Sequence, residues 1–315
     1  MATYLVKRLL LALPVLWGVG TFVFFLLRIL PGDALTTLLQ ESNTNADLAE
    51  LRAELGLDRS LPEQYLDWIG QTATLNFGDS LVTNLPVRSQ LADSIPISAE
   101  MALIGTAVTV LVAVPGGIIA AARQDSLWDH GTRIVSVLFL ALPNFWLATL
   151  ALVLPAYYFG WVPPLKYVPI WEDPVTNLKQ FAIPGVILGL SSASVGLRLM
   201  RSQMLEVLRQ DYVRTGRAKG LAGRVVLIRH AAPNALIPVL ALLGNEFARI
   251  LGGTVILETI FGLPGVGRLT VDAISRRDYP QVELNVLFFA LEFVAVNLLV
   301  DVWYGVLDPR VRYVA

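Results

Sequence analysis

Six long apolar stretches constrain this 315-residue chain more than any other feature of its sequence. Each can cross the hydrocarbon core of a bilayer, about 30 Å thick, as a helix whose backbone groups satisfy one another internally. The chain is 55% hydrophobic and only 16% charged, with a mean hydropathy of +0.61. The sequence therefore predicts an all-α membrane protein with six transmembrane helices. The predicted spans are Leu9–Leu30, Ser98–Ala122, Ile134–Gly160, Phe181–Leu197, Pro233–Leu257 and Leu284–Gly305.

The distribution of Lys and Arg between the connections predicts the orientation of these spans. If the amino terminus lies inside, the inner segments hold 14 basic residues and the longer outer segments hold 8. Cytoplasmic segments retain positive charge, so both termini are expected in the cytoplasm. The first span follows Lys7 and Arg8 as a signal peptide would, but its apolar run is too long and no small-residue cleavage site follows. We therefore expect it to stay as an anchor.

The spans divide the chain into four parts: 1–30 with the first span, an outer cap over 31–97, the other five spans over 98–305, and a cytoplasmic tail over 306–315. A basic inner loop, residues 201–230, separates the fourth and fifth spans. Pro115 and Pro143 lie inside spans and predict bends, because proline removes an amide donor and clashes with the preceding turn.

The outer cap is acidic and carries two helix signals. It holds ten Asp or Glu against three Arg. Leucines at helical spacing predict one helix over residues 48–55, and Ser60 with Glu63 forms a capping box that predicts a second helix ending at Gly70. Such a cap either meets a soluble partner or a solute outside the membrane, or it is a solvated loop that packs on the helix ends. The residues leave both interpretations open.

The basic inner loop has a short helix signal of its own. Asp211 can cap a helix over Tyr212–Lys219, and Gly220 can end it in the left-handed conformation. So short a helix is marginal alone in water, so we expect it to rest on the bilayer surface or in a protein groove. Gly216 weakens it by about 1 kcal/mol relative to Ala and permits close approach of another backbone.

The side chains of this segment suit an acidic partner. Arg214, Arg217 and Lys219 are available to acidic groups, and Tyr212 is a candidate aromatic anchor. Composition alone is equally consistent with simple retention of positive charge on the inner side.

Five motifs give the chain a family resemblance. The inner loop carries Asp211, Tyr212, Val213, Arg214, Thr215, Gly216, Arg217, Ala218, Lys219, Gly220 and Leu221, followed by Arg229, His230 and Asn234–Pro238. The others are Tyr4 to Asp33 at the first span and its exit, Glu54–Asp58 in the cap, Glu258–Arg268 after the fifth span, and Val300–Arg310. Together they resemble the ATP-binding cassette importer permeases of the dipeptide, oligopeptide and nickel branch, in particular its first permease subunit.

The resemblance implies a type I importer permease in the cytoplasmic (inner) membrane of a prokaryote. In that family the short helix beginning at Asp211 docks into a cleft on the ATPase subunit and couples its closure to alternating access. The implied partners are a sister permease, expected to form a heterodimer, two ATPase subunits that bind ATP and Mg, and an extracytoplasmic solute-binding protein. Peptides are the expected solute, with nickel chelates, glutathione or another small solute as alternatives. Gly216 stands where that branch usually has Ala.

The charged residues Glu246, Arg249 and Glu292 fall inside predicted spans. An unpaired charge at membrane depth costs several kcal/mol, so such residues normally face a bundle interior or a wet cavity. Glu246 and Arg249 are three residues apart on one helix face and can pair. With Asn245 and Asn297 they either line the solute path or form an internal ion pair that fixes helix packing.

The segment after the fifth span is the candidate outer gate. Glu258, Phe261, Pro264 and Gly265 belong to or flank a Gly-rich run that matches neither a phosphate loop nor a dinucleotide fingerprint. We interpret this run as a tight outer turn. Arg28, near the outer end of the first span, can extend to the interface and needs no other role.

What the sequence lacks narrows the function further. No G-x-x-x-x-G-K-[ST] motif is present, so this chain cannot hold ATP through a P-loop. With zero cysteines and only His130 and His230, we expect no metal, no cofactor and no enzymatic activity. The near balance of 24 basic and 25 acidic residues argues against nucleic acid. A stand-alone secondary transporter would need an internal repeat, and a membrane hydrolase a nucleophile with its base; we find no clear sign of either.

Overall fold

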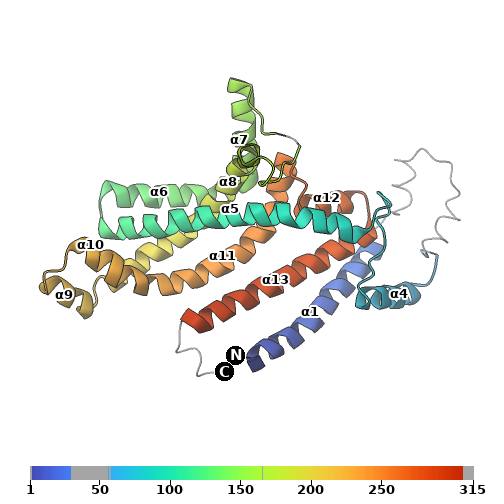
Figure 1. The fold of residues 1–315 in the computed structure, drawn as a ribbon, viewed down its shortest axis with the longest axis horizontal. Helices are drawn as coiled ribbons and strands as arrows, with labels where there is room; N and C mark the ends of the chain where they lie inside the picture. Colours follow the sequence, from blue (N-terminus) through green and yellow to red (C-terminus); the bar gives the residue numbers. More distant parts are fainter. Residues whose placement is uncertain (1, 30–55, 57, 165, 308–315) are drawn as a thin grey trace. The chain divides into compact units, whose positions relative to one another are not determined.

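The structure is a computed structural model that describes residues 2–29, 56, 58–164 and 166–307 (Figure 1). These residues are predominantly helical. In chain order the helices are α1 (Ala2–Ile29), α4 (Leu61–Ala73), α5 (Val87–Ala122), α6 (Leu127–Ala141), α7 (Asn144–Phe159), α8 (Pro174–Val207), α9 (Asp211–Ala218), α10 (Gly223–Val225), the π-helical η1 (Val226–Ala231), α11 (Ala232–Phe261), α12 (Val266–Ser275) and α13 (Tyr279–Leu307).

Five of the six predicted spans are confirmed as helices long and apolar enough to cross a membrane. Their apolar helical stretches are Val6–Ile29, Val87–Ala122, Pro174–Val207, Gly223–Phe261 and Tyr279–Val302. Each helix begins before the predicted span, because hydropathy detects only the apolar part of a helix, whereas the first residues of these helices include polar ones. At the start of α8, for example, the Asp173 carboxylate accepts hydrogen bonds from the backbone N–H groups of Val175 and Thr176.

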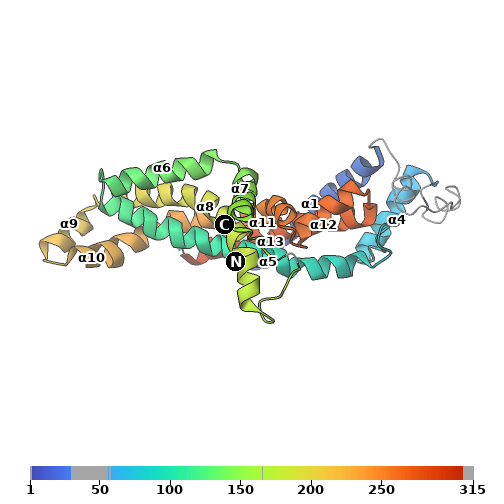
Figure 2. The same ribbon diagram turned by 90° about the horizontal axis from the view of Figure 1, so that it is seen from above.

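The third predicted span, Ile134–Gly160, is not a single helix. It is broken into α6 and α7, whose axes differ by 96° (Figure 2). Leu142 is extended at φ −86° and ψ 125°, and so is Pro143. A residue before proline is pushed out of the helical region by the proline ring, which explains a break where we expected a bend. Pro115, by contrast, lies inside α5, which is unbroken.

The chain divides into two compact units. Unit 1 comprises Met1–Ile97 and Pro264–Val294, and unit 2 comprises Ser98–Leu263 and Ala295–Ala315. Unit 1 therefore holds α1, α4, α12 and the first part of α13.

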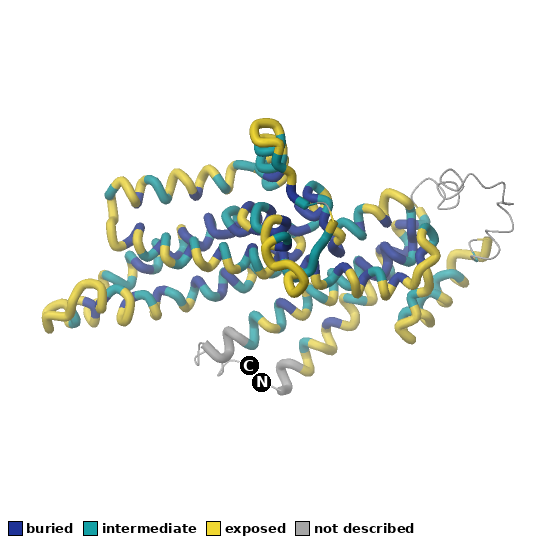
Figure 3. The backbone as a smooth tube through the Cα atoms, turned by 45° about the horizontal axis from the view of Figure 1, so that its top comes forward, coloured by how far each residue is buried: buried dark blue, intermediate teal, exposed yellow. Residues whose placement is uncertain are grey.

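Unit 2 is organised around α8, which contacts α6, α7 and α11. In its most apolar window 61% of α8 is buried, against 33% or less in the other four long helices (Figure 3). Glycines allow α5 to approach α8 closely. A Cβ atom on Gly117 would lie 2.5 Å from Met200 Cβ, and one on Gly189 would lie 2.5 Å from Val108 Cβ. Small residues of this kind let membrane helices approach one another.

Unit 1 packs the cap helix α4 against α1. Phe24 of α1 lies 5.3 Å from Tyr65 and 5.4 Å from Trp68, ring centroid to ring centroid. The predicted capping box is confirmed: the Glu63 carboxylate accepts hydrogen bonds from the Ser60 hydroxyl and backbone N–H. These bonds lower the pKa of Glu63. The same helix continues past the predicted end at Gly70 to Ala73.

Two other expectations for the outer side have different outcomes. The predicted helix over residues 48–55 lies outside the described residues. The Gly-rich run interpreted as a simple turn instead ends α11 and opens a further helix, α12, which the sequence analysis did not predict.

Candidate functional site

The candidate coupling segment is the short helix α9. It begins and ends close to the predicted positions: Lys219 is its C-cap, and Gly220 follows at φ +78°, the left-handed conformation that glycine adopts without strain. The N-cap is Gln210, so the prediction that Asp211 caps the helix is wrong. Asp211 is the first helical residue, where its negative charge interacts favourably with the positive end of the helix dipole and stabilises the helix.

Contacts with its own chain hold α9 in place. Val213 is 1% exposed, and α9 contacts the π-helical stretch η1. The amide of Asn234 donates to the Tyr212 hydroxyl at 2.9 Å and to the backbone oxygen of His230 at 3.1 Å, and the Tyr212 hydroxyl donates to the same His230 oxygen at 3.4 Å. A helix of 8 residues therefore gains from tertiary contact the stability that it lacks alone.

The rest of α9 is a solvent-facing basic surface. Arg214, Arg217 and Lys219 are exposed, and the side chains of Arg214 and Asp211 retain 74% and 98% of their accessible surface. The Asp211–Arg214 ion pair, at 3.8 Å, is surface-exposed, and such pairs contribute little. These cations are therefore available to an acidic partner.

Among the residues that the structure describes, no other backbone lies close to Gly216. A Cβ atom there would lie 3.6 Å from Leu221 Cδ1, which is ordinary van der Waals contact, and one on Gly220 would meet nothing within 4 Å. The small side chain of Gly216 thus leaves room beside this helix that no described backbone fills.

Glu246 and Arg249 form the ion pair that their spacing predicts. Arg249 donates to one Glu246 oxygen from two nitrogens, at 2.5 and 3.1 Å. The carboxylate side chain keeps 9% of its surface, whereas the guanidinium side chain keeps 58%. Asn245 is exposed and Asn297 half-buried in the same unit, while the half-buried Glu292 belongs to unit 1. The predicted ion pair is thus present on one face of α11.

The candidate gate residues separate into two groups. Glu258 and Phe261 are buried at the end of α11, and the Ser98 hydroxyl donates to Glu258 Oε1 at 2.7 Å. Gly262, at φ +70°, ends α11. Pro264 is exposed and Gly265 is the N-cap of α12, both in unit 1.

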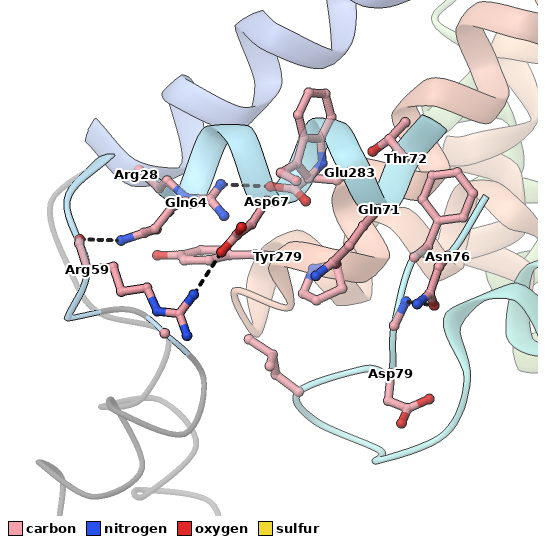
Figure 4. A pocket seen from close by; sticks show the side chains of 16 residues that line it. Arg28, Arg59, Gln64, Asp67, Gln71, Thr72, Asn76, Asp79, Tyr279 and Glu283 are labelled. Carbon is pink, nitrogen blue, oxygen red and sulfur yellow. Dashed lines mark hydrogen bonds and ion pairs between the residues drawn. The ribbon is translucent and has the colours of Figure 1, made fainter. Parts of the chain in front are cut away.

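A network around Arg28 overturns the prediction that this residue merely reaches the interface. Arg28 donates to Glu283 Oε1 at 2.7 Å and to Gln64 Oε1 at 3.0 Å. Its guanidinium carbon lies 3.5 Å from the Phe24 ring centroid. Arg28, Gln64 and Glu283 line a cavity of about 350 Å³ beside α4 (Figure 4). Glu283 lies one residue before the predicted sixth span, so it was not considered as a charge at membrane depth. The helix begins at Tyr279 and includes Glu283.

Sequence reasoning also missed the ion pair that joins α6 to α8. Asp129 is fully buried and accepts from Arg201 Nε at 2.6 Å and from a second Arg201 nitrogen at 2.7 Å. The Asp125 backbone N–H donates to the same carboxylate at 3.0 Å. The available signal was a single acidic residue, Asp129, in the first turn of a helix that is mostly apolar beyond Arg133.

No group of three or more His, Cys, Asp or Glu side chains among the described residues could hold a metal ion.

Two family models match the chain. The model described as "Binding-protein-dependent transport system inner membrane component" matches residues 113–313, and the corresponding N-terminal model matches residues 1–102. A Brucella abortus protein named for a peptide transport system permease is 39% identical over 99% of this chain and 100% of its own length. The di/tripeptide transport system permease protein DppB of Pseudomonas aeruginosa is 36% identical over 99% of each chain.

Among solved structures, a chain of the inward-facing MetNI methionine ABC transporter matches with a TM-score of 0.56 and 14% identity. The match covers 71% of this chain and 98% of that one. At this identity the likeness concerns the fold, which is that of a type I importer permease.

Proposed function

The chain belongs to the family of binding-protein-dependent transport system inner membrane components, and on that premise we propose that it is the transmembrane permease subunit of an ATP-binding cassette importer for peptides. The observation that carries the proposal is the extent of the relationship. The family models together span nearly the whole chain, and relatives named for di- and tripeptide transport align with it along 99% of their length or more. The protein is accordingly a multi-pass protein of a bacterial inner membrane.

The energy for transport comes from other subunits in this proposal. The sequence has no P-loop, so ATP and Mg are bound by partner ATPase subunits. Two such ATPases, a sister permease that completes the pathway and an extracytoplasmic solute-binding protein make up the proposed assembly. This chain supplies half of the pathway and performs no catalysis of its own.

We assign α9 as the coupling helix of this assembly. Its buried side, at Val213, and the hydrogen bond that Asn234 at the start of α11 donates to Tyr212 attach it to a membrane helix. Its exposed side presents Arg214 and Arg217 to the cytoplasm in the predicted orientation. A movement of an ATPase bound to that side is thereby passed to α11.

Charge reversal tests the assignment. In the assembled importer in proteoliposomes, Arg214→Glu with Arg217→Glu is expected to lower peptide uptake per ATP hydrolysed by about tenfold or more, since like charges would then face an acidic partner surface. Lys166→Glu with Lys179→Glu, a matched double reversal of exposed lysines on the predicted outer side, should leave this ratio unchanged. Full uptake by the α9 variant in an intact assembly would refute the assignment.

We further propose that Glu246 and Arg249 line the solute path. The carboxylate is buried and fixes one edge of the guanidinium, while most of the Arg249 side chain stays exposed and able to meet a charged end of a peptide. Glu246→Gln with Arg249→Met is expected to change the preference among peptides of different charge, measured by competition for uptake. Unchanged rate and preference, together with a lower melting temperature, would instead make the pair purely structural.

A further inference from the structure

A groove runs along one side of α6. It is lined by His130, Arg133, Ile134, Val137, Leu138 and Ala141, and its volume is about 610 Å³. These residues recur every three or four positions and so share one face of the helix. Asp129 and Ser136, the two buried residues of α6, lie on another face, where α6 meets α8. We call the lined surface the α6 groove.

The α6 groove is polar at one end only. His130 and Arg133 are exposed at its start, near the end of α6 that the distribution of basic residues places on the cytoplasmic side. The next turns are apolar, and Ile134, Val137 and Leu138 retain 68%, 57% and 52% of their accessible surface.

At the basic end Arg133 contacts the Nδ1 atom of His130 and shares its nearest buried carboxylate, Asp129, with Arg201, so two guanidinium groups face one carboxylate. Asp129 is held by two hydrogen bonds from Arg201, and the Arg133 Nε atom lies 4.0 Å from it. Arg123 lies nearby in sequence, with its guanidinium 5.9 Å from the ring centroid of the exposed Trp128. Tryptophan and arginine together are typical of the membrane–water interface, which places this end of the groove at headgroup level.

The dimensions of the groove suit one leaflet. From His130 to Ala141 an α-helix rises about 16 Å, and half of the hydrocarbon core measures about 15 Å. An amphiphile with an anionic head at Arg133 and an apolar tail along Val137 and Leu138 matches both the charge and the length.

We propose that the α6 groove binds an anionic phospholipid of the cytoplasmic leaflet. The phosphate of the headgroup lies against Arg133 and His130, and one acyl chain follows the apolar residues toward Ala141. The inference is independent of the solute that the importer carries.

A single-cysteine experiment tests the site in the assembled importer. Because this chain has no cysteine, Val137→Cys gives it one thiol, which is labelled with bimane in an assembly whose other subunits carry no accessible cysteine. In nanodiscs, brominated phosphatidylglycerol is expected to quench the label more strongly than brominated phosphatidylcholine at equal lipid fraction. Adding Arg133→Gln should reduce the preference for phosphatidylglycerol by about fivefold, the effect of one basic residue near an anionic surface.

The controls separate the outcomes. Arg209→Gln removes an exposed cation on the same predicted side but outside the groove, and it should keep the wild-type preference. Equal quenching by the two lipids in the protein with Arg133 intact would show a non-selective lipid surface and overturn the proposal. Absence of quenching by either lipid would show that another subunit covers the groove, which also overturns it.

Discussion

At the scale of single residues, two ion pairs attach helices that lie far apart in the sequence. Asp129 joins α6 to α8 through Arg201, and Arg28 joins α1 to α13 through Glu283. Sequence periodicity detects partners three or four residues apart, as it did for Glu246 and Arg249. It cannot detect a partner 255 positions away, which is why Arg28 was assigned no role.

Removal of Arg201 should destabilise the protein far more than removal of Arg133. Asp129 has no exposed surface, so Arg201→Gln leaves a buried carboxylate without its two short hydrogen bonds, a loss of about 3 kcal/mol or more. Arg133 is half-exposed and 4.0 Å from the same carboxylate, so Arg133→Gln should cost less than about 1 kcal/mol.

Thermal unfolding of the purified assembly in detergent measures this difference. If both variants lowered the melting temperature equally, the Asp129–Arg201 pair would not be the main attachment of α6. Arg201→Gln with Asp129→Asn, which removes the buried charge as well, should recover part of the loss.

At the scale of helices, the packing of α5 on α8 depends on the absence of side chains. Gly189 lies so close to α5 that a Cβ atom would stand 2.6 Å from the backbone oxygen of Gly105 as well as 2.5 Å from Val108 Cβ. The Thr109 hydroxyl donates to the Gly189 backbone oxygen at 3.0 Å, which fixes the same crossing. Backbone atoms cannot move aside as a flexible side chain can.

Gly189→Ala is therefore expected to lower stability by about 1–3 kcal/mol, through forced separation of the two helices. Gly18→Ala in α1 is the matched control, because a Cβ atom there meets nothing within 4 Å. The melting temperatures of the two variants in the assembled importer provide the comparison. A melting temperature for Gly189→Ala at or above that of Gly18→Ala would contradict the close packing.

At the scale of the whole molecule, the sequence predicted the class of fold and the position of most spans, because a membrane requires long apolar helices with internally satisfied backbones. It also located α9 to within a residue at either end, since Gly220 gives a clear stop signal. The prediction of the third span as one helix was wrong, because the apolar run continues through Leu142 and Pro143, where the chain changes direction. The prediction was wrong again at α12, where a Gly-rich start resembles a turn.

The sequence predicted which residues form the candidate site, but not all of the contacts that hold them in place. The basic residues of α9 and the Glu246–Arg249 pair follow from local spacing. The attachment of α9 through Tyr212 and Asn234, 22 positions apart, does not, because it depends on the turn after Gly220, which brings the helix that begins at Gly223 back beside α9.

The break at Pro143 bears on where water enters the membrane region. The 15 residues of α6 rise only about 22 Å, less than the thickness of the hydrocarbon core. Pro143 has no amide hydrogen, so the Phe139 carbonyl loses the donor that a continuous helix would give it, and the carbonyls that follow it in the last turn have no helical donors either. Bare carbonyls in lipid cost several kcal/mol each. The carbonyls at the bend between α6 and α7 therefore need polar partners, supplied either by water or by polar groups of an adjoining chain, and cannot rest against lipid tails alone.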